Sequence, residues 1–160
     1  MITGGDSGIG RATAVAFAKE GADICIAYYN EHEDAQITKS CIEAQGRRCL
    51  LMAGDIRDEM FCREAVACTV STFGGPDILV NNAGVQFPQA SIEDIPVNQM
   101  ILTFEVNFFG LFIMTKTALP YLKCGSSIIN TTSITAYLGD DQLIDYSSTK
   151  GAIVSFTRAM

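Results

Sequence analysis

Short apolar, β-prone runs alternate with longer helical stretches along the whole 160-residue chain. The strand-like runs are residues 24–29, 48–53, 77–80 and 126–132, and the helical stretches are residues 11–20, 30–45, 61–73, 98–123 and 144–160. When helices separate consecutive strands, the strands pair in parallel through right-handed crossovers and the helices cover the sheet. The chain is 48% hydrophobic, which is enough for one core. The pattern therefore predicts a single doubly wound α/β domain over residues 1–160.

A glycine-rich loop precedes the first helical stretch. Only Met1 and Ile2 come before it, so we expect the strand that leads into the loop to be shortened. Gly4, Gly8 and Gly10 have the spacing of a pyrophosphate site, in which one glycine permits a sharp turn, one permits close approach of phosphate and one permits close helix packing. An ordinary structural turn explains a lone glycine-rich loop equally well.

The strand at residues 24–29 ends where a dinucleotide fold meets the adenosine ribose. An acidic residue at this place bonds the 2′-hydroxyl and repels a 2′-phosphate. Tyr28 and Tyr29 stand there instead, so NAD is not selected and the sequence favours NADP slightly. Arg11 has two open interpretations, a partner for a 2′-phosphate or an ordinary surface residue of the first helix.

Small and polar residues follow several of the predicted strands directly. They are the glycine loop at residues 4–10, Asp55, the run Asn81-Asn82-Ala83-Gly84, and Ser133. Ligands of open parallel sheets bind outside the carboxyl ends of the strands. The fold is therefore expected to gather these residues on one edge and to bring Ser133 towards Tyr146.

Tyr146 and Lys150 are four residues apart in the last helical stretch, so they share one face of the helix. A Lys charge about 4 Å from a phenol favours the phenolate by on the order of 4 kcal/mol at an effective dielectric of ~20. The pair then acts as one proton donor and acceptor. Two unrelated residues on a solvated helix are the alternative, and only the neighbouring motifs decide between them.

The helical stretch at residues 98–123 is apolar nearly all round in its middle, which predicts a subunit interface in addition to contact with the sheet. Asn107 is an isolated amide in this apolar segment. A buried amide either caps a backbone irregularity or orders water near a site, and the sequence leaves both open.

Charge and composition exclude several classes of function. The net charge of −7, without a basic cluster, argues against nucleic acid. The six cysteines lack metal-site spacing and are expected to be reduced and mostly buried, and no metal site is expected. His32, the only histidine, is expected at the surface, as are Asp140 and Asp141 in a loop. No leader and no apolar run of about 18 residues is apparent, so the expected location is cytoplasmic.

Five motifs in register carry a resemblance to a known family. They are Thr3-Gly4-x-x-x-Gly8-Ile9-Gly10, Asn81-Asn82-Ala83-Gly84, Asn107, Ser133 and Tyr146-x-x-x-Lys150. In this order the chain resembles the short-chain dehydrogenases/reductases, and further details look like the glucose/ribitol dehydrogenase-like branch. The resemblance implies a Rossmann-like three-layer αβα fold and reversible hydride transfer between a nicotinamide and an alcohol or carbonyl, possibly of a sugar or polyol.

The resemblance also implies roles for individual residues. Tyr146 would exchange the proton of the substrate oxygen, Lys150 would tune that phenol and bind the nicotinamide ribose, and Ser133 would orient the substrate. Asn107 would hold a water that links Lys150 to solvent. The cofactor contacts it implies are Gly4, Asp6, Ser7, Gly8, Ile9, Gly10, Tyr28, Asp55, Ile56, Asn82, Ala83, Gly84, Tyr146 and Lys150.

More specifically, Asp55 would contact adenine, Ala83 and Gly84 would border the adenosine and its ribose, and Asn81 would tie the central sheet together. The family pattern also implies a homo-oligomer, a dimer or tetramer, assembled through residues 98–123 and 144–160.

This chain departs from the family at both ends. Whole members begin with a complete first strand and continue beyond the Tyr/Lys helix with a sixth strand and a substrate loop. We therefore expect a fragment with an unpaired sheet edge beyond residues 126–132 and weak activity in isolation. The alternative function is a non-catalytic nucleotide-binding or interaction protein derived from such an enzyme. The glycine spacing and Asn-Asn-Ala-Gly disfavour a third class, the sugar-nucleotide epimerases and dehydratases.

Overall fold

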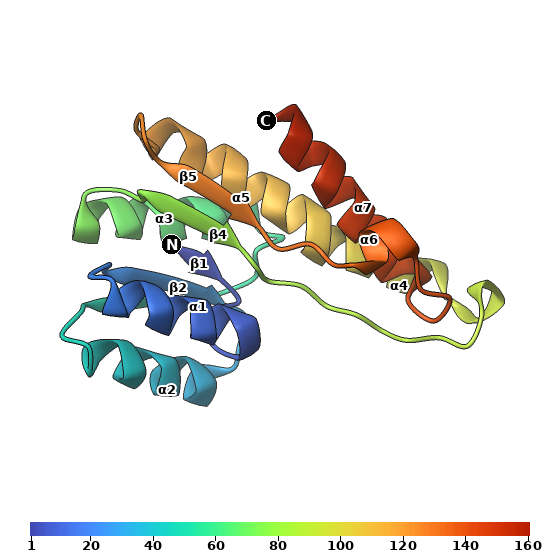
Figure 1. Cartoon of the computed structure of the whole chain (residues 1–160), viewed down its shortest axis with the longest axis horizontal. Helices are drawn as coiled ribbons and strands as arrows, with labels where there is room; N and C mark the ends of the chain where they lie inside the picture. Colours follow the sequence, from blue (N-terminus) through green and yellow to red (C-terminus); the bar gives the residue numbers. More distant parts are fainter.

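Five parallel strands form one sheet with the order β3-β2-β1-β4-β5 in the computed structural model, which describes residues 1–160 (Figure 1). The strands are β1 (Ile2–Thr3), β2 (Ile24–Tyr28), β3 (Cys49–Ala53), β4 (Ile78–Asn81) and β5 (Ser127–Asn130). The register places Ile2 of β1 opposite Ile26 on one side and Val80 on the other. The predicted doubly wound parallel sheet is confirmed, with a first strand of two residues that lies at its centre.

The helices cover the sheet on both faces, as the alternation of elements requires. They are α1 (Gly8–Lys19), α2 (His32–Glu43), α3 (Glu59–Phe73), α4 (Val97–Phe104), α5 (Leu111–Ala118), α6 (Thr135–Leu138) and α7 (Ile144–Ala159), with single turns η1 (Ile92–Asp94) and η3 (Leu119–Tyr121) and the π-helix η2 (Glu105–Gly110). One core joins α1 and α2 to the sheet, and a second joins α3 and α5 to its other face. Figure 1 shows α7 lying along the α4–α5 side.

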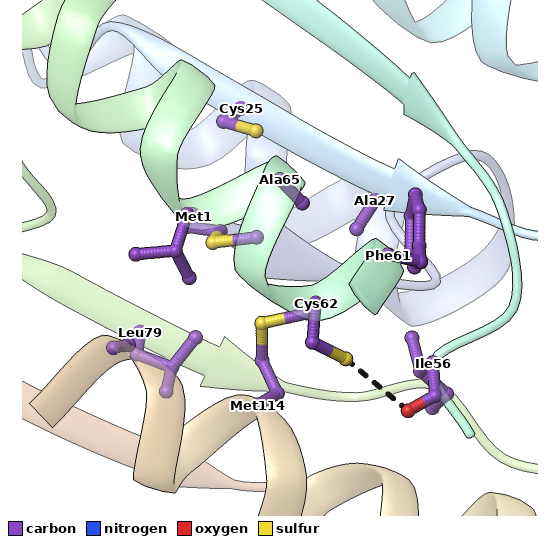
Figure 2. Packing of buried hydrophobic residues seen from close by; sticks show 11 residues of the cluster. Met1, Cys25, Ala27, Ile56, Phe61, Cys62, Ala65, Leu79 and Met114 are labelled. Carbon is purple, nitrogen blue, oxygen red and sulfur yellow. Dashed lines mark hydrogen bonds between the residues drawn. The ribbon is translucent and has the colours of Figure 1, made fainter. Parts of the chain in front are cut away.

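The second core is drawn in Figure 2, where Cys62 of α3 lies next to Met114 of α5, and Phe61 and Ala65 of the same helix lie towards Ala27 of β2. These α3 residues recur at helical spacing, so one face of the helix is buried. Asp58 caps the amino end of α3 with its carboxylate, which accepts from the backbone amide of Met60. Gly74, in the left-handed conformation, caps the carboxyl end.

All six cysteines are free thiols. Cys25 and Cys62 are fully buried, and Cys62 donates from Sγ to the carbonyl oxygen of Ile56 over 3.2 Å (Figure 2). Burial raises the pKa of Cys62 to about 12 and that of Cys49 to about 12. The expectation of mostly buried thiols is only partly met, because Cys41, Cys49 and Cys68 are half-buried and Cys124 is exposed.

The long helical stretch is not one regular α-helix, because a π-helical turn at Glu105–Gly110 interrupts it around Asn107. Several apolar side chains on it remain at the surface, including Phe109 at 50% and Phe112 at 43% exposure. Val97–Tyr121 is long and apolar enough to cross a membrane, with a mean hydropathy of 1.4 in its most apolar window. The sequence analysis, which searched for an uninterrupted apolar run, did not predict this. In this fold the segment packs against α3, β4 and α7 as a core helix.

The sheet ends at β5, which pairs only with β4. Its residues alternate between exposed and half-buried, and Ile129 is 44% exposed. Edge strands with exposed apolar side chains favour pairing with further chain. The expected unpaired edge is therefore present in this structure.

Candidate functional site

A cleft of about 700 Å³ opens at the carboxyl ends of the central strands. Its walls include every cofactor residue expected from the sequence except Gly10, Tyr146 and Lys150. The expected residues that line it are Gly4, Asp6, Ser7, Gly8, Ile9, Tyr28, Asp55, Ile56, Asn82, Ala83 and Gly84. The glycine loop, Asp55 and Asn82 to Gly84 thus meet in one cavity, whereas Asn81 and Ser133, which were expected at the same edge, do not line it.

The glycines of the loop meet three different physical demands. A Cβ on Gly4, which has φ +60°, would lie 2.9 Å from Cα of Ala83. A Cβ on Gly10 would lie 2.0 Å from the carbonyl oxygen of Gly4. Gly10 therefore lets α1 pack onto the loop and does not itself line the cleft. Gly8 has φ +51° and open space beside it, as backbone that a ligand approaches requires.

The start of α1 presents unused hydrogen-bond donors to the cleft. Ser7 occupies the N-cap without a side-chain cap, and no protein group accepts from the amides of Gly8, Ile9 and Gly10. Amides at a helix N-terminus, together with the helix dipole, favour an anion. The donor set and the open backbone at Gly8 fit a pyrophosphate.

Arg11 does not face the cleft. Its guanidinium donates to the carbonyl oxygen of Asp6 over 2.7 Å and to Thr38 Oγ1 over 2.8 Å, and it pairs with Asp34 over 2.7 Å. Of the two interpretations left open by the sequence, the 2′-phosphate partner loses support. Arg11 instead ties the glycine loop to α2.

The part of the cleft that follows β2 holds a charged residue, Glu31, that the sequence analysis missed. Glu31 lines the wall beside Tyr28 and Tyr29, three positions beyond the place where an acid was sought. Tyr28 is buried, and its hydroxyl lies 3.0 Å from Nδ1 of His32. Glu31 lies three residues after the end of β2, so a search that extended beyond the strand end would have found it.

Asp55 and Arg57, which follow β3, form an ion pair in the lining of the same cleft. Arg57 Nη2 lies 2.6 Å from Asp55 Oδ2, and Arg57 also reaches Glu105 over 3.2 Å. Hydrogen bonds from Arg57 hold the pKa of Asp55 below its ordinary value. Arg57 lines the cleft but was not among the expected site residues. Only the fold reveals it, since a lone Arg before a helix is ordinary in sequence.

Side-chain amides brace the strand ends around the cleft. Asn82 donates from Nδ2 to the carbonyl oxygen of Gly4 over 3.0 Å, and its backbone amide donates to Thr3 Oγ1. Asn81 donates from Nδ2 to Thr115 Oγ1 and to Asn130 Oδ1, both over 2.9 Å. Asn81 therefore joins β4, β5 and α5, in agreement with the role expected for it in the central sheet.

Lys150 lies over the ring of Tyr146, with Nζ 5.3 Å from the ring centroid. The side chain is 3% exposed, and Nζ donates to the carbonyl oxygen of Thr131 over 3.0 Å. Burial lowers the pKa of Lys150. The two residues are therefore neighbours on one face of α7, and the alternative of an unrelated pair on a solvated helix is wrong.

Ser133 follows β5 and precedes α6, which packs on α7. Its Oγ accepts from the backbone amide of Thr135 over 3.2 Å and from Thr135 Oγ1 over 3.1 Å. The preceding Thr132 donates to the carbonyl oxygen of Lys150 over 3.0 Å. Ser133 thus lies in the loop before α6, the helix that packs on the Tyr146 helix, although no hydrogen bond joins the side chains of Ser133 and Tyr146.

Asn107 is 1% exposed, and its amide is fully used. Oδ1 accepts from the amide of Val85 over 2.7 Å, while Nδ2 donates to the carbonyl oxygen of Val85 over 2.9 Å and to Thr149 Oγ1 over 3.1 Å. Its place in the π-helix favours the first of the two sequence interpretations, an amide at a backbone irregularity.

Gly84 connects the cleft to the Tyr146 side of the fold. A Cβ on Gly84 would lie 3.2 Å from Asn107 Oδ1 and 3.7 Å from Lys150 Nζ. The last residue of the Asn-Asn-Ala-Gly run therefore borders the cleft on one side and the buried Lys150 on the other. This contact joins the expected cofactor residues to the expected catalytic ones.

A parallel sheet with a glycine loop at its carboxyl edge and a Tyr/Lys pair beside the cleft defines a nucleotide-binding domain of the Rossmann type. A family model described as short chain dehydrogenase matches residues 1–160. The chain belongs to the short-chain dehydrogenase/reductase family, whose members are NAD(P)-dependent oxidoreductases.

Three known proteins illustrate the likeness. General stress protein 39 of Bacillus subtilis (strain 168) is 61% identical over 160 residues, all of this chain and 56% of that protein. Glucose and ribitol dehydrogenase of Daucus carota is 39% identical over 166 residues, all of this chain and 57% of that protein. A solved short chain dehydrogenase from Burkholderia cenocepacia J2315, in complex with NADP, is 35% identical with a TM-score of 0.94 and covers 99% of this chain and 64% of that one.

The chain thus spans little more than half the length of the curated relatives it matches. The glucose and ribitol dehydrogenase among them agrees with the branch expected from the sequence.

Proposed function

We propose that residues 1–160 form a single NAD(P)-binding domain with the catalytic residues of an oxidoreductase acting on an alcohol/carbonyl pair. The observation that carries the proposal is the buried Lys150 held over Tyr146, with Gly84 between this pair and the glycine-lined cleft. Burying a charged ammonium group costs free energy, so a buried lysine beside a tyrosine indicates that its charge serves the reaction.

In the proposed reaction a bound nicotinamide supplies or accepts hydride. Tyr146 donates its phenolic proton to the substrate oxygen in reduction and takes the proton from the alcohol in oxidation. Lys150 favours the ionised phenol through its charge, and it lies close enough to Gly84 to reach a ribose bound there. Ser133 offers a hydroxyl beside α7 to orient the substrate oxygen. Asn107 holds Val85 and Thr149 in place, so its part is to keep the two halves of the site together.

NADP is the proposed cofactor of the two dinucleotides. The absence of an acid at Tyr28 and the NADP complex of the Burkholderia relative support it. Glu31 disfavours NADP, because a carboxylate in the lining beside Tyr28 would repel a 2′-phosphate. Titrating the chain with NADPH and with NADH, using cofactor fluorescence, decides the preference. The variant Glu31→Gln should tighten NADPH binding by about fivefold and leave NADH unchanged, since Glu31 is exposed and one charge pair about 4 Å apart at a water-like dielectric of ~80 is worth about 1 kcal/mol.

The proposed substrate is a small sugar, polyol or aldehyde. The support is the Daucus carota relative, named for glucose and ribitol. The proposed assembly is a homo-oligomer through α4, α5 and α7, supported by the exposed apolar side chains of Phe109 and Phe112 on that face.

The decisive experiment compares Tyr146→Phe with the parent chain, first in NADPH binding and then in ribitol oxidation and glyceraldehyde reduction. We expect binding within twofold and turnover lower by about 10²–10⁴, the usual contribution of a positioned proton donor. Tyr121→Phe serves as the matched control, because it removes the same hydroxyl group from an exposed tyrosine that does not line the cleft. Binding without any Tyr146-dependent turnover would favour the non-catalytic alternative.

A further inference from the structure

The carboxylate of Asp145 is fully buried, and none of the roles above uses it. Oδ2 accepts from Gln99 Nε2 over 3.0 Å and from Thr103 Oγ1 over 2.8 Å, both on α4. Oδ1 accepts from the backbone amide of Tyr146 over 2.8 Å. The side chain next to the proposed proton donor therefore anchors the start of α7 to α4.

Three groups donate to the carboxylate of Asp145: the side-chain NH₂ of Gln99, the backbone N–H of Tyr146, and the hydroxyl of Thr103, which also lies 2.9 Å from the carbonyl oxygen of Gln99. An ionised carboxylate is acceptor-only and satisfies all three. It also lies in the first turn of α7, where the helix dipole favours negative charge. An asparagine has nearly the same shape but must direct an NH₂ group at one of these donors, so the isostere breaks the arrangement without creating a cavity.

Gln99 extends this network to the segment that leaves the cofactor cleft at Gly84. Its Nε2 also donates to the carbonyl oxygen of Phe87 over 3.0 Å, and its Oε1 accepts from Gln89 Nε2 over 2.7 Å. The backbone amide of Gln89 donates to the carbonyl oxygen of Gln142 over 2.9 Å. The hydrogen bonds of Gln99 and Gln89 therefore connect three segments to one another, namely residues 85–91, α4 and the loop before α7.

The backbone of Tyr146 is held on both sides. Its N–H is bound by Asp145, and its carbonyl oxygen accepts from Thr149 Oγ1 over 2.7 Å. Thr149 in turn accepts from Asn107, which binds Val85. Two separate polar connections thus run from the first turn of α7 to the end of the cofactor cleft, one through Asp145 and one through Asn107.

We propose that Asp145 is a positioning residue for Tyr146, and that the network Asp145, Gln99 and Gln89 fixes the phenol relative to the cofactor cleft. The inference rests on the proposed function of Tyr146. Displacing a reacting group by about 1 Å can lower a rate by on the order of 10²-fold. Asp145 does not line the cleft, so its effect passes through the groups that it holds, the backbone of Tyr146 and the side chains of Gln99 and Thr103 on α4.

The test uses the purified chain with Asp145→Asn, and Asp141→Asn as a matched acid-to-amide control in an exposed loop. We expect Asp145→Asn to lower kcat for ribitol oxidation and glyceraldehyde reduction by about 30–100-fold. The Kd for NADPH should stay within twofold, because the glycine loop lies on a different part of the fold. Amide hydrogen exchange should accelerate at least about tenfold in residues 144–149 and 85–89. Asp141→Asn should match the parent chain throughout.

Two further variants separate positioning from general loss of structure. Thr103→Val removes one donor and keeps the carboxylate, so it should lower kcat by about five- to tenfold while the chain remains folded. Gln99→Met keeps the side-chain volume but removes the amide that joins Asp145 to Phe87 and Gln89, so it should also lower kcat by about five- to tenfold while the chain remains folded. A purely structural role would give equal losses in kcat and NADPH affinity.

Unchanged exchange at residues 144–149 together with unchanged kcat in Asp145→Asn would overturn the proposal. Failure of the proposed function looks different, because then Tyr146→Phe turns over like the parent chain or neither chain turns over. In that case kcat carries no information, and amide hydrogen exchange at residues 144–149 alone tests whether Asp145 anchors α7. Faster exchange supports the anchoring of α7 by Asp145, and unchanged exchange overturns it.

Discussion

Replacing Gly10 with Ala tests the close packing of α1 on the glycine loop. The added Cβ would lie 2.0 Å from the carbonyl oxygen of Gly4 and 2.7 Å from Nδ2 of Asn82. Real Cβ atoms essentially never approach a heavy atom more closely than 3.0 Å, and the nearest atom here belongs to the backbone. The helix and the loop must therefore separate by about 1 Å, because no flexible side chain can yield.

The size of the effect follows from that separation. Forced overpacking costs about 3 kcal/mol, and weakening the hydrogen bond from Asn82 to Gly4 adds about 1 kcal/mol. The free energy of unfolding of a domain this size is about 5–15 kcal/mol, so the variant should fold with reduced stability. Displacement of the first turn of α1 should also weaken NADPH binding by at least about tenfold.

Urea unfolding followed by circular dichroism measures the change, with two glycine controls. Gly8→Ala meets no neighbouring atom but has φ +51°, so backbone strain alone should cost about 1 kcal/mol. Gly151→Ala, in the interior of α7 with open space beside it, should stabilise by about 0.5–1 kcal/mol. The reasoning is refuted if Gly10→Ala lies within about 1 kcal/mol of the parent chain or is no less stable than Gly8→Ala.

Three other predictions concern buried and paired polar groups. Asn107→Leu keeps the volume but leaves the amide and carbonyl of Val85 without partners, so the free energy of unfolding in urea should fall by about 2–4 kcal/mol; a smaller change than 1 kcal/mol would contradict this. The hydrogen bonds of Arg57 hold the pKa of Asp55 below its ordinary 3.8, so the stability that Asp55 contributes is present above that value and is lost as the pH falls through the lowered one. Acid unfolding of Asp55→Asn should lack this loss, and identical acid curves would count against the pair. Burial lowers the pKa of Lys150 below 10.5, so between the two values the unfolded chain binds more protons and the parent chain gains stability as the pH rises. Lys150→Met should lack that gain when the two are compared in urea at alkaline pH, and parallel pH curves would argue against it.

Local sequence patterns anticipated the architecture well. The strands and helices lie close to the expected residues, because apolar periodicity and turn residues act over short spans of chain. The separate reasons for Gly4, Gly8 and Gly10 also agree with their surroundings, since close approach and positive φ leave few other residue types. One exception is Asn107, whose residue type marked an irregularity without specifying it, and the structure places a π-helix there.

The amino-acid sequence by itself determined the parallel sheet, the family motifs and the edge at which they meet, because these depend on the order of elements and on spacing along the chain. Tertiary structure alone decided that Arg11 binds α2, that Glu31 and Arg57 line the cleft, and that Asp145 is buried against Gln99. The physical reason is that a polar side chain's partner and exposure depend on residues 20 or more positions away, as with Asp145 and Gln99, separated by 46 positions. Such pairs become neighbours only when the helices pack.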